Sequence, residues 1–244
     1  KNQEWLSPIE NKIKKITQNQ FSRNVLSPYK PTFQFKDAIP RRSILVIRLS
    51  KRVLGQRTAR LFGTLAVSAL LSAAREQDVL PYDQRVPHFL CIDELQHVVS
   101  GALATAFSEH RHYKMGIIST TQYTEQISNI DRNLLASMFG NIGTLLAFRS
   151  SNSDARLLAE QIGEFAPQQF TALGLGEMRV RLLFDGDVVV PFKAFSDHNH
   201  FEPHNRGDEF IDYVRQRYTV PRAEVEAKYA RWARIQLIDP AELK

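Results

Sequence analysis

Two adjacent carboxylates end a short apolar run and are the residues in this sequence best suited to chemistry. The apolar run, residues 89–92, is followed directly by Asp93 and Glu94. In open α/β sheets ligands bind at the carboxyl ends of the strands, where both side chains would lie. In a nucleotide hydrolase, one carboxylate at this edge organises the Mg²⁺ shell and the other polarises the attacking water. The pair also suits the N-terminus of a following helix, which favours negative charge without any catalytic role.

A polar side chain follows the next apolar run. Residues 116–120 form this run, and Gln122 comes just after it. Because parallel strands present their carboxyl ends at one edge of a sheet, Gln122 is expected close to the two carboxylates. The sequence thus predicts three roles: Asp93 holds Mg²⁺ through water, Glu94 activates the attacking water, and Gln122 senses the γ-phosphate.

Alternating strand and helix patterns are expected to position these side chains. Short β-branched or apolar runs predict strands, and apolar residues at helical spacing predict the helices between them. The order predicts an α/β fold with a mostly parallel sheet, helices on both faces and right-handed crossovers. Around Asp185-Gly186 a hairpin is expected to add antiparallel strands at one edge. The predicted strands are residues 43–50, 89–92, 116–120, 144–148, 178–184 and 188–192, and the helices between them are 55–76, 102–113, 132–139 and 153–162.

Composition divides the chain into four predicted parts. Residues 1–42 form an irregular basic segment, interrupted by prolines and containing a short basic helix at 9–21. Residues 43–195 form the α/β core. Residues 196–207 are a polar linker, and residues 208–244 form a tail with helices at 208–217 and 222–238.

Positive charge is concentrated in the first quarter of the chain. Residues 1–60 contain 14 Lys and Arg against 3 Asp and Glu, a net +11, whereas the whole chain is +6. This asymmetry favours an anionic partner such as nucleic acid or nucleotide phosphate, although a solvated basic surface explains it equally well. The residues expected to contact DNA backbone or phosphate follow the first predicted strand: Lys51, Arg52, Arg57 and Arg60.

Other sequence features exclude some classes of protein. The single cysteine, Cys91, rules out a disulfide within the chain. No apolar stretch reaches the roughly 20 residues that a membrane-spanning helix requires. The histidines at 198, 200 and 204 are spaced closely enough to bind a metal, but solvated loop histidines are the expected reading.

Several stretches, taken in their order along the chain, resemble the second half of the ATPase domain of HerA–FtsK superfamily P-loop motors. The resemblance is strongest to conjugative type IV coupling proteins and HerA-like ATPases. Residues 89–94 resemble a Walker B segment and residues 119–122 a sensor glutamine segment. Each motif is loose, and only their order makes the match specific. The other matching stretches are residues 44–55, 111–116, 143–163, 170–192 and 217–225.

The resemblance implies the C-terminal part of a RecA-like core that uses ATP and Mg²⁺ and assembles as a homo-oligomeric, hexameric ring. Arg149 and Arg111 would reach a neighbouring subunit's nucleotide, the alternative being surface ion pairs. The implied activity is DNA translocation without sequence preference, in conjugation, type IV secretion or HerA-like DNA processing. The implied location is cytoplasmic, at the inner face of the membrane, with a membrane or secretion-complex partner recruited through an N-terminal region.

One departure from the family pattern affects activity. No Gly-x-x-x-x-Gly-Lys-Ser/Thr loop, the Walker A element that holds the phosphates, occurs in the 244 residues. In the family this loop lies upstream of the matching region, so we expect these residues alone neither to bind ATP tightly nor to hydrolyse it. One alternative is a non-catalytic interaction or scaffold subunit that keeps an ATPase-like fold. Another is a different P-loop enzyme, such as a helicase or packaging ATPase, which shares the fold and differs in its partner.

Overall fold

The computed structural model describes residues 7, 19–28, 30–197 and 205–233 of the chain. They form two compact units. One comprises residues 1–34, 50–59 and 203–244, and the other comprises residues 35–49 and 60–202. Most of the predicted helix at 9–21, part of the predicted linker and the end of the last predicted helix lie outside the described residues. The four-part division predicted from composition stays a prediction.

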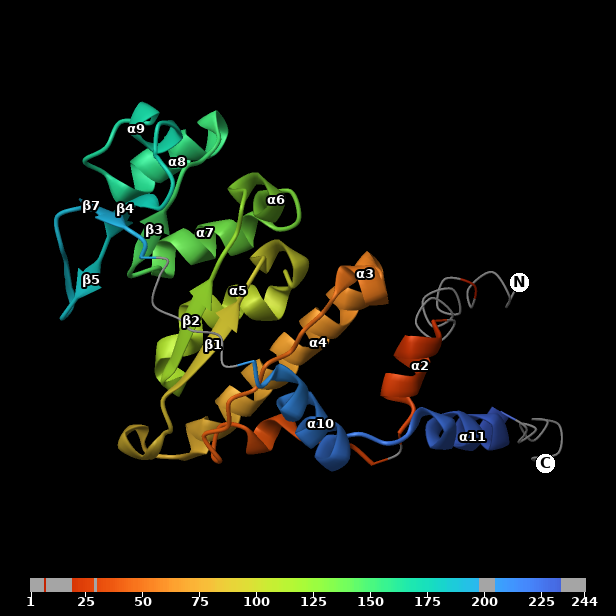
Figure 1. Ribbon diagram of the computed structural model, residues 1–244. Helices are drawn as coiled ribbons and strands as arrows, with labels where there is room; N and C mark the ends of the chain where they lie inside the picture. The colour runs from red at the N-terminus through yellow and green to blue at the C-terminus, as the bar shows by residue number, and fades with distance from the viewer. Residues whose placement is uncertain (1–6, 8–18, 29, 198–204, 234–244) are drawn as a thin grey trace. The chain divides into compact units, whose positions relative to one another are not determined.

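A parallel pair of strands lies at the centre of the larger unit (Figure 1). Strands β1 (His88–Ile92) and β2 (Met115–Ser119) pair from His88↔Met115 to Ile92↔Ser119. The connection between them contains α5 (Gly101–Glu109), which begins at the N-cap Ser100 and is followed by a 3-10 turn, His110–Tyr113. The predicted strand–helix–strand order is therefore confirmed for this part of the chain.

One face of the parallel pair is buried in the main core. Apolar residues of β1 pack there with residues of α4 (Gln56–Arg75), α5 and α7 (Arg132–Asn141). The opposite face is exposed: Phe89 retains 73% of its accessible surface, and Cys91 and Ile118 are also exposed. Because side chains alternate between the faces of a strand, the apolar run of β1 supplies both faces. Helices on both faces of a parallel sheet were expected, and the described residues cover only one.

A second, antiparallel sheet follows, in place of further parallel strands. Strand β3 (Leu145–Ala147) pairs with β4 (Glu177–Arg181), and β4 pairs with β7 (Phe192–Phe195). Between β4 and β7 the short strands β5 (Leu183–Phe184) and β6 (Asp187–Val188) form the tip of the predicted hairpin. Asp185 and Gly186 have φ of 51° and 91°, the left-handed conformations that a two-residue type I′ turn requires.

Short helices connect β2 to β3 and β3 to β4. Helix α6 (Thr124–Ser128) follows β2, and Asp131 caps the start of α7 through the backbone amides of Asn133 and Leu134. Helix α8 (Asn152–Ile162) begins at the N-cap Ser151 and ends at Gly163, whose φ of 74° suits glycine. With α9 (Gln168–Thr171) it forms a small second core around the fully buried Phe170.

The predicted first strand, residues 43–50, is not a strand in the structure. Its residues form no β-ladder, and Ile44 and Val46 are 90% and 72% exposed. A β-branched run favours extended backbone, but a strand also requires a neighbouring strand to accept and donate its backbone hydrogen bonds. Among the described residues no strand pairs with this run, so the prediction is wrong for the structure at hand.

The smaller unit joins residues from both ends of the chain. It contains α2 (Gln20–Leu26), α3 (Lys51–Leu54), α10 (Gly207–Tyr218) and α11 (Arg222–Ala233). Gln20 Nε2 and Asn24 Nδ2 donate to Glu226 Oε1 at 2.8 and 3.1 Å, and Arg23 lies over the Tyr229 ring. Hydrogen bonds from Arg222 and Asn24 lower the pKa of Glu226. Polar contacts therefore hold α2 against α11.

His88, a half-buried histidine at the start of β1, makes stability depend on pH. Its Nδ1 lies 3.1 Å from the carbonyl oxygen of Val86, and its Nε2 is buried with no partner among the described residues. Burial lowers the pKa of His88 below its ordinary value of 6.5. As the pH falls, the unfolded chain therefore protonates at His88 before the folded chain does. The contribution of His88 to the free energy of unfolding is fully present above pH 6.5 and is lost as the pH drops below that value.

We expect His88→Gln to remove part of this acid sensitivity, because glutamine stays neutral. Thermal unfolding of both proteins between pH 7.5 and pH 5.5 measures the effect, and NMR titration of the imidazole should give a pKa below 6.5. An equal loss of melting temperature in both proteins would contradict the assignment.

Candidate active site

The carboxyl ends of β1 and β2 bring the predicted carboxylates and the loop of Gln122 together. Backbone hydrogen bonds extend the ladder beyond both strands: Thr120 N donates to Ile92 O, and Leu95 N donates to Thr120 O, each at 2.9 Å. Asp93 and Glu94 are therefore held beside residues 120–122. The neighbourhood predicted from the order of the two apolar runs is the one that this register produces.

Asp93 is exposed and keeps one carboxylate oxygen available. Thr120 Oγ1 donates to Asp93 Oδ1 at 2.6 Å. No hydrogen bond to the other oxygen, Oδ2, is formed by any residue that the structure describes. Mg²⁺ usually keeps several waters and binds through one or two carboxylates together with substrate phosphates. An oriented aspartate with a solvent-facing oxygen fits such a water-mediated Mg²⁺ site.

Glu94 adopts a backbone conformation that is unusual for its residue type. Its φ and ψ are 57° and 60°, in the left-handed region, and its amide donates to Thr120 Oγ1 at 3.2 Å. A non-glycine residue there costs about 1–3 kcal/mol, and such residues cluster at functional sites where the surroundings enforce them. The left-handed turn sends the carboxylate toward the loop after β2. The Glu94 side chain makes no capping hydrogen bond in the turn that follows, so helix capping does not account for this carboxylate.

Both oxygens of the Glu94 carboxylate accept hydrogen bonds from amide side chains. Gln122 Nε2 donates to Oε1 at 2.6 Å, and Gln96 Nε2 donates to Oε2. His97 Nε2 lies 3.9 Å from Oε2. The two amide groups hold the carboxylate in one orientation, and a carboxylate within reach of a water can act as a general base. The arrangement can therefore orient a base at the strand ends.

Three of the contacting residues were not assigned roles from the sequence: Gln96, Thr120 and Thr121. Gln96 is buried beside Leu95 and Val98, and its Oε1 accepts from Thr121 Oγ1 at 3.1 Å. The available signal was a polar residue within the apolar stretch that follows the carboxylates. Hydroxyl and amide side chains are common in loops, so sequence spacing alone did not distinguish these residues from solvated ones.

The two candidate trans-acting arginines occupy different places in the larger unit. Arg111 lies in the 3-10 turn before β2, at the opposite end of that strand from Gln122. Arg149 lies in the loop between β3 and α8, and its exposed side chain has no hydrogen bond or ion pair with any described residue. The structure does not bring Arg111 to the carboxylates. It does link the Arg149 loop to the Gln122 loop.

A buried carboxylate makes this link. Asp154, 4% exposed in the first turn of α8, accepts hydrogen bonds from the backbone amide of Thr124 at 3.3 Å and from its hydroxyl. Ser151 caps the same helix, with its Oγ accepting from the Asp154 amide at 3.2 Å. The start of α6, just after Gln122, is thereby fixed to the start of α8, just after Arg149.

All four predicted phosphate-contacting cations are exposed and lie at helix starts. Lys51 and Arg52 are on α3, and Arg57 and Arg60 are near the start of α4. Neither helix has an acidic residue in its first turn. At the start of the 20-residue α4 such cations oppose the helix dipole, and a bound anion would relieve that repulsion. In the four-residue α3, Lys51 and Arg52 belong to the last turn as well as the first.

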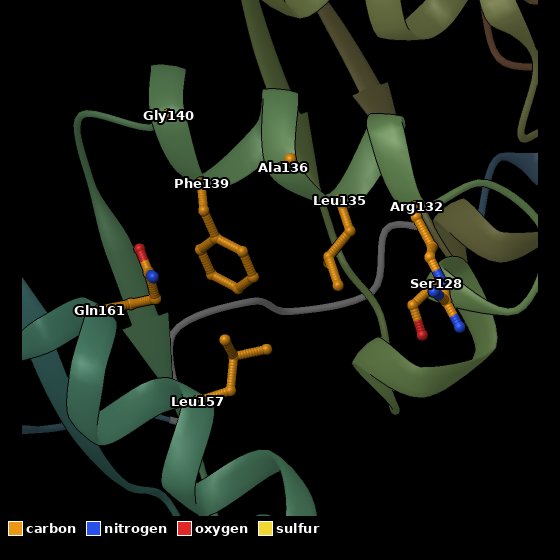
Figure 2. A pocket seen from close by; sticks show the side chains of 8 residues that line it. All are labelled: Ser128, Arg132, Leu135, Ala136, Phe139, Gly140, Leu157 and Gln161. Carbon is orange, nitrogen blue, oxygen red and sulfur yellow. The ribbon is translucent and has the colours of Figure 1, made fainter.

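A groove of about 550 Å³ lies away from the carboxylates, between α7 and α8. Figure 2 shows Leu135, Phe139 and Leu157 pointing into it, with Arg132 near one end. None of the predicted site residues lines this groove. Elsewhere, residues 7, 19–28, 30–197 and 205–233 contain no group of three metal-ligating side chains and no helix long and apolar enough to cross a membrane. The histidines at 198, 200 and 204 lie outside the described residues.

No protein-family profile and no curated protein matches the sequence, but solved structures share its fold. The bacterial conjugative coupling protein TrwB, in complex with a non-hydrolysable ATP analogue, matches with a TM-score of 0.52 at 14% identity over 62% of this chain and 39% of TrwB. Its trigonal form with sulphate gives 0.51, at 14% identity over 62% and 40%. The genome-packaging NTPase B204 of Sulfolobus turreted icosahedral virus 2 gives only 0.41, at 14% identity over 68% and 73%.

The chain thus spans about two fifths of the length of TrwB. At such low identity the likeness concerns the fold alone. The described residues form an α/β structure with a small parallel sheet, and they share this fold with the coupling protein TrwB.

Proposed function

We propose that these residues form the water-activating part of an ATP-driven DNA translocase of the HerA–FtsK type. The observation that carries the proposal is the meeting of Asp93, Glu94 and Gln122 at the carboxyl ends of paired parallel strands. Asp93 would hold Mg²⁺ through water, acting as the Walker B aspartate. Glu94 would accept a proton from the attacking water, and Gln122 would respond to the γ-phosphate. Bound ATP and Mg²⁺ would supply the phosphoryl group and its charge neutralisation.

The phosphate-binding (Walker A) part of the site would come from polypeptide outside these 244 residues. Parallel sheets are normally covered on both faces, yet Phe89, Cys91 and Ile118 are exposed here. Among the described residues β2 pairs only with β1, which leaves its other edge unpaired. An uncovered face and an unpaired edge are what a sheet shows when further strands and helices are missing.

The active species would be a homo-oligomeric, hexameric ring that grips DNA backbone without sequence preference. Lys51, Arg52, Arg57 and Arg60 would contact phosphates, and Arg149 would reach the nucleotide of the neighbouring subunit. The neighbour TrwB is a conjugative coupling protein, which favours DNA transfer by conjugation or type IV secretion as the process. Such a motor would work in the cytoplasm at the inner face of the membrane, recruited by a membrane or secretion-complex partner.

The test compares ATP hydrolysis by the 244-residue chain with hydrolysis by the same chain preceded by a segment that carries a Walker A loop. We expect Mg²⁺-dependent turnover only in the longer protein. Binding to duplex DNA should weaken steeply with salt and be insensitive to sequence, since phosphate contacts release counterions. Absence of turnover in the longer protein, with DNA present, would refute the proposal.

A scaffold role is the second candidate, favoured by the absence of a Gly-x-x-x-x-Gly-Lys-Ser/Thr motif from the sequence. In that case the fold would serve docking only, and the genomic sequence upstream of Lys1 would encode no such loop. Reading that sequence therefore discriminates between a motor and a scaffold before any assay.

A further inference from the structure

A buried glutamine, Gln96, donates a hydrogen bond to the Glu94 carboxylate. Gln96 lies in the turn Leu95–His97 after β1, and only 5% of its surface is accessible. Leu95 and Val98, its neighbours in this turn, are apolar and buried. A polar side chain in such surroundings is costly unless its hydrogen bonds are made, so its carboxamide needs specific partners.

The nitrogen and the oxygen of the Gln96 carboxamide each make a hydrogen bond, and the two partners lie in different segments of the site. Nε2 donates to Glu94 Oε2, and Oε1 accepts from Thr121 Oγ1 at 3.1 Å. The chemistry of the partners fixes which way the amide faces, because an ionised carboxylate only accepts hydrogen bonds. Gln96 therefore bridges the turn after β1 and the loop after β2.

The two oxygens of Glu94 differ in their surroundings. Oε2 faces the buried Gln96, whereas Oε1 accepts from Gln122, which is an exposed side chain. An exposed hydrogen bond can exchange its donor for water, but the buried one cannot do so without leaving a polar group unsatisfied. Oε1 is therefore the oxygen from which Gln122 can be displaced by an attacking water.

We propose that Gln96 is a positioning residue for Glu94: it holds Oε2 so that Oε1 faces the site, where Gln122 and water alternate. This inference rests on the function proposed above and adds a residue to it. In this role Gln96 acts through its hydrogen bonds to Glu94 and Thr121.

The chain supplies a matched control for the loss of a buried amide. Gln77 is likewise 5% exposed, but it links the starts of the same two strands. Its Nε2 donates to Tyr113 O at 3.1 Å, and its Oε1 accepts from Val86 N at 2.7 Å. Replacing Gln77 by methionine should therefore lower stability without disturbing Glu94.

The test uses Gln96→Met, which keeps the side-chain length, in the ATPase that carries a Walker A loop. We expect kcat to fall about 10- to 100-fold, as for a catalytic group that is slightly misplaced, with KM for ATP nearly unchanged. Gln77→Met should lower the melting temperature but leave kcat unchanged. The Thr121 hydroxyl also donates to Tyr123 O at 3.2 Å. Thr121→Val should therefore lower kcat less than Gln96→Met, and its effect should be smaller in the Gln96→Met background, where its bond to Gln96 is already lost.

A measurement on the 244-residue chain gives a readout that does not require activity. The side-chain amide NMR signals of Gln122, which report its contact with Glu94, should move in Gln96→Met and stay in place in Gln77→Met. Should Gln96→Met fail to fold, Thr121→Val provides both the kinetic and the NMR comparison.

The outcomes separate this inference from the proposed function. Unchanged kcat and unchanged Gln122 signals in Gln96→Met, together with an inactive Glu94→Gln, would overturn the positioning role and leave the function intact. An active Glu94→Gln would overturn the function itself.

Discussion

Glu94→Gln in the ATPase that carries a Walker A loop should lower kcat about 10²- to 10⁴-fold, the usual contribution of a positioned general base. Glutamine has nearly the size of glutamate, so the left-handed turn and the packing should be retained. Its amide, however, cannot take a proton from water. One of its two ends would also place a donor against Gln96 or Gln122, which both donate to this side chain.

Single-turnover ATP hydrolysis measures this effect, because it separates the chemical step from product release. Nucleotide affinity should be retained, since Glu94 is assigned to the water and Asp93 to the metal. Glu125→Gln on α6 is a suitable control, because Glu125 is exposed and makes no contact with the Glu94 carboxylate. Hydrolysis by Glu94→Gln at the rate of this control would remove Glu94 from its role.

Arg149→Ala should lower kcat about 10³- to 10⁵-fold in the assembled ring, the range for an arginine that acts on a neighbouring subunit's nucleotide. Its exposed side chain has no partner among the described residues, so its removal should leave the fold of the subunit intact. The loop itself remains tied to α6 through Asp154 and Thr124. Arg156, exposed on α8, provides a control substitution on the same segment.

Mixing the two inactive proteins tests whether Arg149 acts in trans. A subunit with Arg149→Ala keeps Glu94, and a neighbour with Glu94→Gln keeps Arg149, so part of the activity should return. In a random one-to-one mixture roughly a quarter of the head-to-tail interfaces pair the two intact groups. If the mixture remains as inactive as its components, Arg149 does not reach across a subunit interface.

The sequence alone determined the local features that depend on short-range patterns. The apolar runs that became β1 and β2, and the helical spacing that became α4, α7 and α8, predicted these elements and their order. Asp185-Gly186 predicted the hairpin tip, because few residues adopt two successive positive φ angles. Placing Asp93, Glu94 and Gln122 together also followed from sequence, since parallel strands end at one edge.

Tertiary structure decided the features that depend on a partner distant in the chain. Residues 43–50 have strand-like composition but form no strand, because a strand needs a hydrogen-bonded neighbour that sequence pattern does not provide. Arg111 and Arg149 were equivalent candidates in the sequence, but only Arg149 is in a loop linked to the Gln122 loop. The positioning role proposed for Gln96 rests on its burial and on its hydrogen bond to Thr121, 25 residues away. Sequence pattern does not predict such contacts, because they depend on which distant segments pack together.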